Sequence, residues 1–396
     1  MFAVRREAMG RETQSLRSVL LLCWRDIGHP QGGGSETYLQ RIGAQLAASG
    51  VAVTLRTARY PGAARRELID GVQISRAGGR YSVYVWALLA MAAARLGVGP
   101  LRQARPDVVV DTQNGLPFMA RLVYGRRVAV LVHHCHREQW PVAGRMLGRL
   151  GWFVESRLSP RLHRRNQYVT VSLPSARDLV GLGVGNERIA VVRNGLDEAP
   201  EVCLGGPRAA MPRVLVLSRL VPHKQIEDAL AAVAVLRPSM PELHLDIVGG
   251  GWWWQRLVDH AARLGISDAV TFHGHVDDVT KHHVMQQSWV HLLPSRKEGW
   301  GLAVVEAAQH AVPTIGYRSS GGLADSIIDG VTGALVDGRA ELVNRLQQLL
   351  ADPVLRDQLG AKAQARSAEF SWQQSADAMR TVLESMMTGN RVSGVI

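Results

Sequence analysis

Short apolar runs alternate with helical stretches twice along this chain, and this pattern constrains the fold more than any other feature. Before a Pro-, Gly- and Ala-rich segment at 199–212, the strand-like runs cover 18–24, 51–57, 107–112, 127–134, 168–172 and 189–194. After it they cover 213–218, 243–249, 269–274, 289–294 and 313–317. Apolar strands separated by helices are typical of parallel sheets covered on both faces. The sequence therefore predicts an α/β protein with two Rossmann-like, doubly wound domains that bind ligands at the carboxyl ends of their strands.

The same alternation predicts the domain boundaries. A length of 396 residues fits two domains better than one. Residues 1–16 are charged and aperiodic, and we interpret them as a disordered lead. We expect an N-terminal domain over 17–205, completed by a C-terminal helix at 372–388, and a C-terminal domain over 206–371. Ser371 is a suitable N-cap for that last helix.

The cysteine pattern and the hydropathy of the chain indicate its cellular compartment. The three cysteines, Cys23, Cys135 and Cys203, are odd in number, lie far apart and have no metal-ligand or redox spacing. This pattern argues against a disulfide framework and favours a reducing compartment, so we expect a cytoplasmic protein. The longest uncharged stretch, 81–94, is shorter than the about 18 residues that a membrane-spanning helix needs.

Positive charge is unevenly distributed along the chain. The formal net charge is +12, and ten arginines lie between Arg121 and Arg165 against two acids, Glu138 and Glu155. Such a field favours anionic partners such as phospholipid headgroups, nucleotide diphosphates or nucleic acid, while a solvated surface explains it equally well. Aromatic residues and arginines do not alternate as in a nucleic-acid-binding module. We therefore expect peripheral contact with an anionic membrane and no nucleic-acid partner.

Two glutamates eight residues apart, Glu298 and Glu306, form the strongest local motif. Glu298 follows a predicted strand, and Gly299 and Gly301 allow the backbone to approach a ligand before a helix that begins near Leu302. Free N–H groups at a helix N-terminus suit a phosphate, and ionised glutamates accept hydrogen bonds from hydroxyl-rich ligands. Two glutamates at this spacing are usually only solvated, but the glycines and the strand end favour a binding site.

This segment resembles the E-x7-E signature of family 4 retaining glycosyltransferases. The resemblance is carried by Glu298-Gly-Trp-Gly-Leu-Ala-Val-Val-Glu306 and by its continuation over 312–336, with Trp300 where the family usually has Phe. It implies the GT-B fold, in which two domains face across a cleft and the C-terminal one holds most of a nucleotide-sugar donor. It also implies that Glu298 contacts hydroxyls of the donor sugar and Glu306 the ribose, beside Gly299, Gly301 and Leu302.

A second matching motif, 217–230, contains two cations near the end of a predicted strand. Arg219 and Lys224 lie five residues apart, just before a helix. Two fixed cations would neutralise a leaving diphosphate without a metal, whereas the pair in isolation would be read as surface charge. The resemblance implies the catalytic role for both.

Three glycine-rich or polar segments supply further candidates. Gly33 and Gly34 open the first predicted helix and suit close approach to the donor, although the fingerprint G-x-G-x-x-G is not satisfied. Ser35 follows them, and Asn194 lies in a segment that the resemblance places along the cleft, so both are acceptor-side candidates. Gly249 follows a C-terminal strand and matches a donor-side turn of the family.

Histidines follow the predicted strand at 127–134. A metal site is improbable there, because neighbouring residues of an extended segment point to opposite faces. The resemblance implies one histidine near the anomeric carbon of the donor, and register leaves His133 and His136, with His136 preferred.

The resemblance implies retaining transfer of a hexosyl group from a UDP- or GDP-sugar to an acceptor hydroxyl. The acceptor would be a carbohydrate, a lipid or another small molecule, in cell-envelope glycolipid or polysaccharide synthesis, at the inner face of the membrane if not free in the cytoplasm. We expect no cofactor and no metal. The alternatives are a sugar-nucleotide epimerase or a glycan phosphorylase on the same fold, or a basic nucleic-acid-binding protein.

Overall fold

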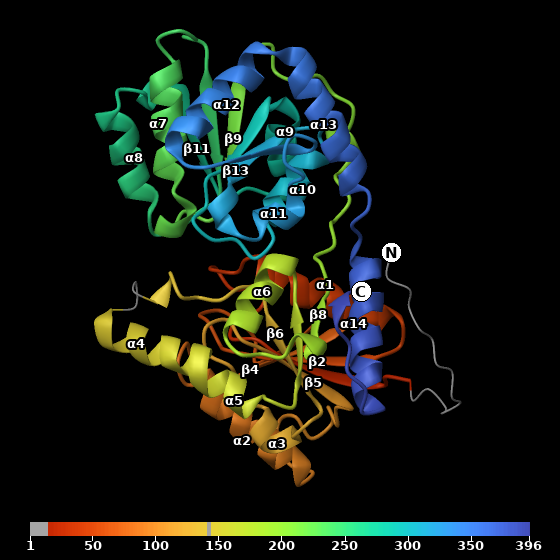
Figure 1. Cartoon of the computed structure of the whole chain (residues 1–396). Helices are drawn as coiled ribbons and strands as arrows, with labels where there is room; N and C mark the ends of the chain where they lie inside the picture. The colour runs from red at the N-terminus through yellow and green to blue at the C-terminus, as the bar shows by residue number, and fades with distance from the viewer. Residues whose placement is uncertain (1–14, 141–143) are drawn as a thin grey trace.

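The computed structural model describes residues 15–140 and 144–396, whose strands form two large sheets (Figure 1). Most of the predicted disordered lead, residues 1–14, lies outside the described residues. The prediction of disorder is wrong for Leu16, which is buried in the N-terminal core. Its backbone N–H donates to the carboxylate of Glu384 on the C-terminal helix at 3.2 Å, so this part of the lead is held by packing.

In the part of the chain that the structure describes, the N-terminal sheet has nine strands in the order β15-β8-β7-β6-β5-β1-β2-β4-β3. The strands are β1 (Ser18–Leu22), β2 (Ala52–Thr57), β3 (Arg66–Ile69), β4 (Val72–Arg76), β5 (Val108–Thr112), β6 (Val128–Val132), β7 (Gln167–Thr170), β8 (Ile189–Val191) and β15 (Gly394–Val395). Neighbours are parallel except at the β3–β4 edge. The helices are α1 (Gly34–Ala48), α2 (Val83–Arg95), α3 (Arg121–Tyr124), α4 (Arg145–Phe153), α5 (Ser159–Leu162) and α6 (Leu173–Gly181).

The C-terminal sheet is parallel throughout and, over the same described residues, has six strands in the order β11-β10-β9-β12-β13-β14. Its strands are β9 (Arg213–Leu217), β10 (His244–Val248), β11 (Val270–Gly274), β12 (Val290–Leu293), β13 (Thr314–Tyr317) and β14 (Gly333–Val336). Its helices are α7 (Ile226–Leu236), α8 (Trp254–Arg263), α9 (Asp278–Gln287), α10 (Leu302–Ala308), α11 (Leu323–Ser326), α12 (Arg339–Ala351) and α13 (Pro353–Ser367). The predicted fold class, two doubly wound α/β domains, is confirmed.

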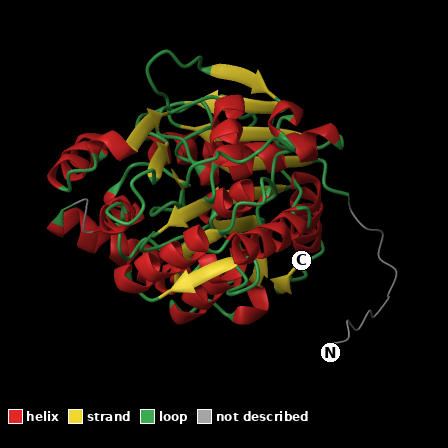
Figure 2. Cartoon of the chain, turned by 90° about the horizontal axis from the view of Figure 1, so that it is seen from above, coloured by secondary structure: helices red, strands yellow, loops and turns green. Residues whose placement is uncertain are grey.

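Helices cover both faces of each sheet. Figure 2 shows the helices in red around and between the yellow strands. In the N-terminal domain, α1 packs on one face, where Leu39 and Ile42 share a core with Val19 and Leu21 of β1. The alternate β1 residues, such as Leu20, point to the other face and pack with α2. Because parallel crossovers are right-handed, the chain that returns from β4 to β5 and continues to β8 places α2 to α6 on this second face.

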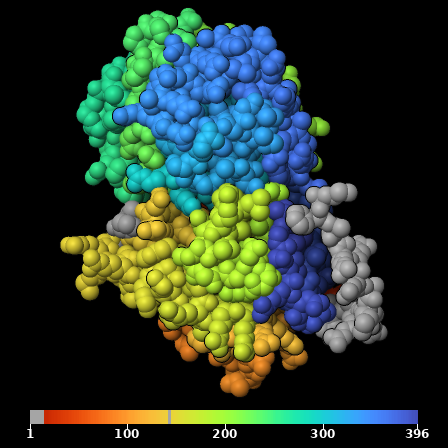
Figure 3. All heavy atoms as spheres, viewed as in Figure 1, coloured from red at the N-terminus to blue at the C-terminus, as the bar shows by residue number. Residues whose placement is uncertain are grey.

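The last helix, α14 (Trp372–Met387), packs against α1 of the N-terminal domain. Ser371 caps it by accepting a hydrogen bond from the backbone N–H of Gln374 at 3.2 Å. Trp372 then stacks edge-on against Tyr38, with 6.1 Å between ring centroids. In Figure 3 the dark blue C-terminal segment accordingly lies on the lower, N-terminal lobe. The chain thus crosses between the domains at two places, the segment around 199–212 and the segment before α14.

The uncharged stretch at 81–94 forms α2, a helix of 13 residues that buries Val83, Ala87 and Met91 against the sheet. Packing inside the domain explains these three residues, whereas Val85, Trp86 and Leu89 of the same helix are exposed. None of the helices formed by residues 15–140 and 144–396 is both long and apolar enough to cross a membrane.

Candidate functional site

The loop after β12 carries Glu298 and is tied to a neighbouring turn. The backbone N–H of Glu298 donates to the carbonyl oxygen of Ser320 at 2.9 Å, and that of Gly322 donates to the carbonyl oxygen of Glu298 at 3.2 Å. A Cβ atom at Gly322 would lie 2.3 Å from the carbonyl oxygen of Gly299, so the turn approaches this loop closely only because residue 322 is a glycine. This contact fixes the position of the Glu298 side chain.

Lys224 and Glu298 form an ion pair at the carboxyl ends of β9 and β12. Lys224 ends a short 3-10 helix, Pro222–Lys224, which the left-handed residue Gln225 joins to α7. Burial by itself raises the pKa of Glu298, but the charge and hydrogen bond of Lys224 outweigh it and hold the pKa below its ordinary value. Glu298 is therefore ionised at neutral pH.

Arg219 lies between the two domains beside two of the predicted glycines. A Cβ atom at Gly33 would lie 3.4 Å from Nε of Arg219, so the first N-terminal helix begins next to this guanidinium. On the other side, a Cβ atom at Gly249 would lie 2.0 Å from the carbonyl oxygen of Ser218, so this turn packs on the backbone that carries Arg219. Desolvation between the domains lowers the pKa of Arg219, although the side chain keeps contact with solvent and stays charged. A Cβ atom at Gly34 would meet only open space.

A third cation, Arg25, was missed by the sequence analysis. Its Nε donates to the carboxylate of Glu36 at 2.9 Å, and both side chains are largely buried. The other oxygen of Glu36 accepts from the backbone N–H of Gly33 and from the hydroxyl of Ser35, each at 2.9 Å. Gly33 therefore connects the two guanidiniums: its N–H donates to the carboxylate that pairs with Arg25, and a Cβ atom there would lie 3.4 Å from Nε of Arg219. Arg25, Arg219 and Lys224 thus form a cation group that spans the domain junction and suits a diphosphate.

Glu306 lies on α10, as predicted, and pairs with a lysine of α9. Nζ of Lys281 is 2.9 Å from the carboxylate of Glu306 and 2.9 Å from that of Asp278. Desolvation lowers the pKa of Lys281, but the charge of Glu306 and both hydrogen bonds outweigh it and raise the pKa above its ordinary value. The side chain of Glu306 is 18% exposed, so it remains reachable from solvent.

The two predicted histidines lie in different surroundings. His133 is buried and stacks edge-on against Tyr38 with 5.1 Å between ring centroids. Within the described residues neither of its ring nitrogens has a hydrogen-bond partner. Burial, and then the charge of His136, lowers the pKa of His133 to about 3. His136 is partly exposed, and its Nδ1 is 3.1 Å from the carboxylate of Glu155.

His134, which the sequence analysis did not select, lies at the domain junction. A Cβ atom at Gly299 would be 3.6 Å from its Nδ1, and its ring centroid is 4.4 Å from that of His136. Burial, followed by the charges of His136, His133, His223 and Lys224, holds the pKa of His134 well below its ordinary value. His134 is therefore neutral at pH 7, like His133, and lies beside Gly299, the residue that follows Glu298.

Glu155 organises the loop that carries these histidines. It belongs to a single π-helical turn, Val154–Leu158, and its side chain is fully buried. One oxygen accepts from the backbone N–H of His136 at 3.0 Å, and the other from Nε1 of Trp140 at 2.6 Å. π-helical turns within α-helices are frequent at functional sites.

We expect Glu155→Ala to lower the free energy of unfolding by about 2–4 kcal/mol, because two buried N–H donors would lose their acceptor. Urea unfolding of both proteins measures the difference. The matched control is Glu138→Ala, which removes the exposed acid of the same arginine-rich segment and should change stability by less than about 0.5 kcal/mol. Equal effects of the two substitutions would contradict this role of Glu155.

Buried neutral histidines predict a loss of stability in acid. Burial lowers the pKa of His133 and of His291 to about 3, well under the about 6.5 of an unfolded chain. Between these values the unfolded state binds more protons, so stability is complete above about pH 6.5 and decreases as the pH falls. At pH 5 each histidine should cost about 2 kcal/mol relative to pH 7.5.

Urea titrations at several pH values measure this slope. His291→Gln keeps a polar group near the hydroxyl of Thr314, which lies 3.0 Å from Nδ1 of His291, and should flatten the profile between pH 5 and 7. His283→Gln, at an exposed position, should leave it unchanged. A wild-type profile that is flat over this range would contradict the buried neutral state of both histidines.

The two acceptor-side candidates, Ser35 and Asn194, lie in different parts of the structure. Ser35 stays with the cation group, since its hydroxyl accepts from Nδ2 of Asn114 at 3.1 Å. Asn194 is buried in the segment that crosses toward α14. Its neighbour Arg193 forms a bidentate pair with Asp325, both distances being 3.0 Å, and so joins the two domains. The structure thus associates Asn194 with the domain contact.

The helix after Glu298 also contributes to the domain contact. Trp300 is 1% exposed and stacks edge-on against Phe370, with 4.9 Å between ring centroids. Leu302 packs against the same core, which includes residues of the N-terminal sheet. Gly301, with φ of +95°, allows the turn between them. In addition, the hydroxyl of Ser172 donates to the carbonyl oxygen of Gly299 at 2.6 Å, so the motif is anchored in both domains.

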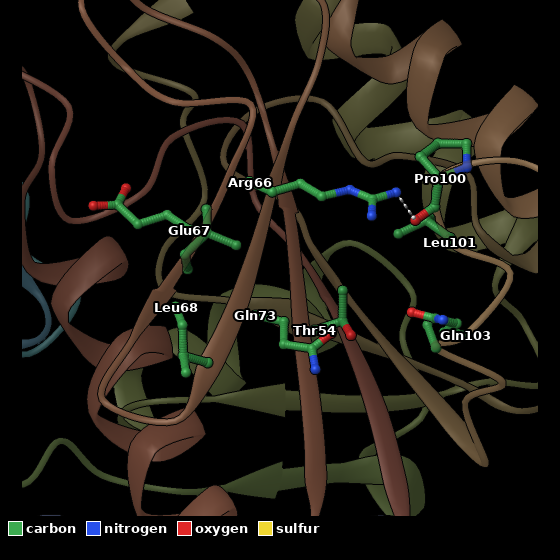
Figure 4. A pocket seen from close by; sticks show the side chains of 10 residues that line it. Thr54, Arg66, Glu67, Leu68, Gln73, Pro100, Leu101 and Gln103 are labelled. Atoms are coloured by element: carbon green, nitrogen blue, oxygen red, sulfur yellow. Dashed lines mark hydrogen bonds between the residues drawn. The ribbon is translucent and has the colours of Figure 1, made fainter.

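A surface hollow lies apart from this group of site residues. A hollow of about 390 Å³ is lined by residues of β2, β3 and β4 and of segment 100–104, and Figure 4 shows Arg66 spanning it to the carbonyl oxygen of Pro100 at 3.3 Å. None of its lining residues is a predicted site residue. Over residues 15–140 and 144–396, no three His, Cys, Asp or Glu side chains are grouped so that they could hold a metal ion.

Known proteins resemble this chain over nearly its full length. Residues 32–199 match the family described as Glycosyltransferase Family 4, and residues 208–366 match Glycosyl transferases group 1. A glycogen synthase of Mycobacterium tuberculosis is 30% identical over 257 residues, 62% of this chain and 62% of that protein. The chain thus spans less than two thirds of that relative.

A second relative and a solved structure complete the comparison. A GDP-mannose-dependent alpha-(1-6)-phosphatidylinositol monomannoside mannosyltransferase of Mycobacterium tuberculosis is 30% identical over 271 residues, 64% of this chain and 68% of that protein. The sucrose-phosphate synthase of Thermosynechococcus elongatus superposes with a TM-score of 0.79 at 21% identity, over 94% of this chain and 100% of that one. This likeness confirms the predicted GT-B arrangement of the two domains.

Proposed function

Because the chain belongs to glycosyltransferase family 4, we propose that it transfers a hexosyl group from a nucleotide-diphosphate sugar to an acceptor hydroxyl with retention of configuration. The observation that carries the proposal is the ion pair of Lys224 with Glu298 at the strand ends of the C-terminal sheet, with Arg219 five residues before Lys224 and against Gly33 of the N-terminal domain. These groups supply cations for a diphosphate and a carboxylate for sugar hydroxyls within one small region.

In this proposal the cation group stabilises the leaving nucleoside diphosphate. The bond between the anomeric carbon and the phosphate oxygen breaks, and negative charge collects on that oxygen. Arg219 and Lys224 are the cations for it, and Arg25 adds to their field from the N-terminal domain. Fixed charges that face the developing charge are worth most in a water-poor site. The acceptor oxygen then bonds to the same face of the sugar, and its proton passes to the phosphate oxygen.

The two glutamates and the histidines would orient the donor. Glu298 remains ionised beside Lys224 and can accept hydrogen bonds from hydroxyls of the sugar. Glu306 would accept from the ribose, with Lys281 holding its carboxylate in place at 2.9 Å. His134 and His136 would donate hydrogen bonds to the donor sugar or the acceptor, and Glu155 fixes the loop that carries them. His133 would act through packing on Tyr38.

The proposal also concerns which nucleotide base the donor carries and which acceptor receives the sugar. UDP- and GDP-sugars both suit the site residues, and a carbohydrate, a lipid or another small molecule could supply the hydroxyl. The arginine-rich segment 121–165 favours an anionic or membrane-bound acceptor, and hence action at the cytoplasmic face of a membrane. The relative that is a phosphatidylinositol monomannoside mannosyltransferase supports a lipid acceptor for this chain.

The test is a donor-turnover assay with UDP- and GDP-hexoses, with and without acceptor fractions. We expect release of nucleoside diphosphate that depends on the acceptor, and a product whose anomeric configuration by NMR is that of the donor. Turnover of the donor without any acceptor, to give an epimeric sugar nucleotide, would favour an epimerase instead. Sugar release that depends on inorganic phosphate, with the visible absorbance of pyridoxal phosphate, would favour a phosphorylase.

A further inference from the structure

The helix α4 exposes an apolar stripe. Met146, Leu147, Leu150 and Phe153 are each more than half exposed, although α4 has only nine residues. At 100° per residue, three of these side chains, at 146, 150 and 153, lie on one side of the helix. Contiguous apolar surface of this kind on a folded protein marks an interaction site more often than chance exposure.

The orientation of α4 is fixed by its opposite side. Gly148 and Gly151 are buried, and a Cβ atom at Gly151 would lie 2.2 Å from the ring of Trp140. Trp152 is partly buried and lies 5.9 Å from the guanidinium of Arg137. The helix therefore packs through its small residues and turns its large apolar side chains outward, and a rotation that buried them would drive Gly151 off Trp140.

Arginines border this stripe. Arg145 and Arg149 lie one turn apart along its edge, and Arg157 and Arg161 continue the charge past the end of α4. All four are exposed, and none forms an ion pair with a carboxylate of the described residues. The one acid on this part of the chain that is buried, Glu155, is occupied by His136 and Trp140. The surface is therefore apolar at its centre and positive at its edge.

Exposed apolar residues also occur on a helix near α4. The crossover rule places α2 on the same face of the N-terminal sheet, where it exposes Val85, Trp86 and Leu89. Figure 1 shows α4, α5, α2 and α3 together at one side of this domain, and in Figure 3 the yellow segment projects from its edge. The end of α4 continues directly into the π-helical turn of Glu155, which holds the His136 loop.

We propose that α4 is an interfacial helix that docks the protein on an anionic lipid bilayer, with the stripe Met146, Leu147, Leu150 and Phe153 inserted and Arg145 and Arg149 at the headgroups. An apolar stripe edged by arginines is the pattern of helices that lie in the plane of a membrane surface. Arginines without carboxylate partners complement anionic lipids, whereas a second copy of this chain would bring like charges together. Docking here would bring a lipid acceptor to the side of the domain that carries the histidine loop, a consequence that rests on the proposed function.

The test is sedimentation of the full chain with vesicles of phosphatidylglycerol and phosphatidylcholine in equal parts, and with vesicles of phosphatidylcholine alone. We expect binding to the anionic vesicles that weakens with salt, and at least about tenfold weaker binding to the zwitterionic ones. Leu150→Ser with Phe153→Ser should weaken binding to anionic vesicles at least about tenfold. The matched control is Val235→Ser on α7, an equally exposed apolar position, which should bind as wild type.

Two outcomes would overturn the proposal. One is equal binding of the wild type and the double variant, and the other is a concentration-dependent dimer that the double variant abolishes, since the stripe would then cover a second copy. The response of each variant to nucleotides in a thermal-shift assay separates this result from the donor site. A variant that still binds nucleotide but no longer binds vesicles supports the docking role. A variant that loses both is misfolded, and the test then passes to Arg149→Gln, a milder change. For the proposal to stand, Arg149→Gln must weaken binding to anionic vesicles about fivefold.

Discussion

Replacing Lys224 by alanine is expected to lower kcat about 10²–10³-fold, with a smaller change in the affinity for the nucleotide. The physical reason is that Lys224 is the cation paired with Glu298, beside Arg219, and would face the charge that develops on the leaving diphosphate. Steady-state kinetics of nucleoside diphosphate release measure the effect. Lys362→Ala, which removes an exposed lysine of α13, is the control and should leave kcat unchanged.

Loss of Lys224 also leaves Glu298 without its partner, so stability must be separated from catalysis. Breaking such a pair costs about 3 kcal/mol when the remaining charge is buried. The double variant Lys224→Met, Glu298→Gln removes both charges and should recover most of that stability without recovering activity. If the double variant were as active as the wild type, or if Lys362→Ala were as damaging as Lys224→Ala, the electrostatic role of Lys224 would be refuted.

Trp300→Ala is expected to lower the free energy of unfolding by about 3–5 kcal/mol. Trp300 lies inside the glutamate motif, but it is 1% exposed and packs on Phe370 within the core shared by the two domains. Its Nε1 has no hydrogen-bond partner among the described residues, so Trp300→Phe should cost much less than truncation to alanine. Chemical denaturation of the three proteins measures these differences.

The control for Trp300 is another tryptophan of the same domain. Trp252 is 61% exposed, and Trp252→Ala should change stability by less than about 0.5 kcal/mol. Equal stability losses at the two positions would show that burial at the domain junction does not set the effect. A Trp300→Ala protein that is as stable as the wild type but has lost nucleotide binding would instead make Trp300 a ligand contact.

Most of the fold could be predicted from the sequence, because buried parallel strands are short, apolar and separated by helices. The β3–β4 edge was missed, since Arg66–Ile69 is largely exposed and its residues alternate no more clearly than a loop. The strand β15 has two residues, too few for any periodicity. The π-helical turn at Val154–Leu158 was also missed, because its residues suit an ordinary helix equally well.

The site could be predicted only as far as residues adjoin strand ends in the sequence. Glu298 was selected for its strand end and flanking glycines, and Arg219 and Lys224 for their match to the family motif. Arg25 also follows a strand, β1, but no motif singled it out. The choice between histidines rested on strand alternation, which stops with β6 at Val132, so it could not be extended to His134 or His136. The partners Lys281 and Glu155 depend on packing between helices, which local sequence does not encode.

The central claim is that the C-terminal domain binds a nucleotide sugar with Glu306 on the ribose, and a thermal-shift panel of UDP, GDP and ADP with their common sugar conjugates tests it most directly. We predict that one base stabilises the wild type, that Glu306→Ala loses this response, and that Glu242→Ala, at an exposed position, keeps it. A wild type that no nucleotide stabilises, or a Glu306→Ala protein that responds like the wild type, would contradict the account.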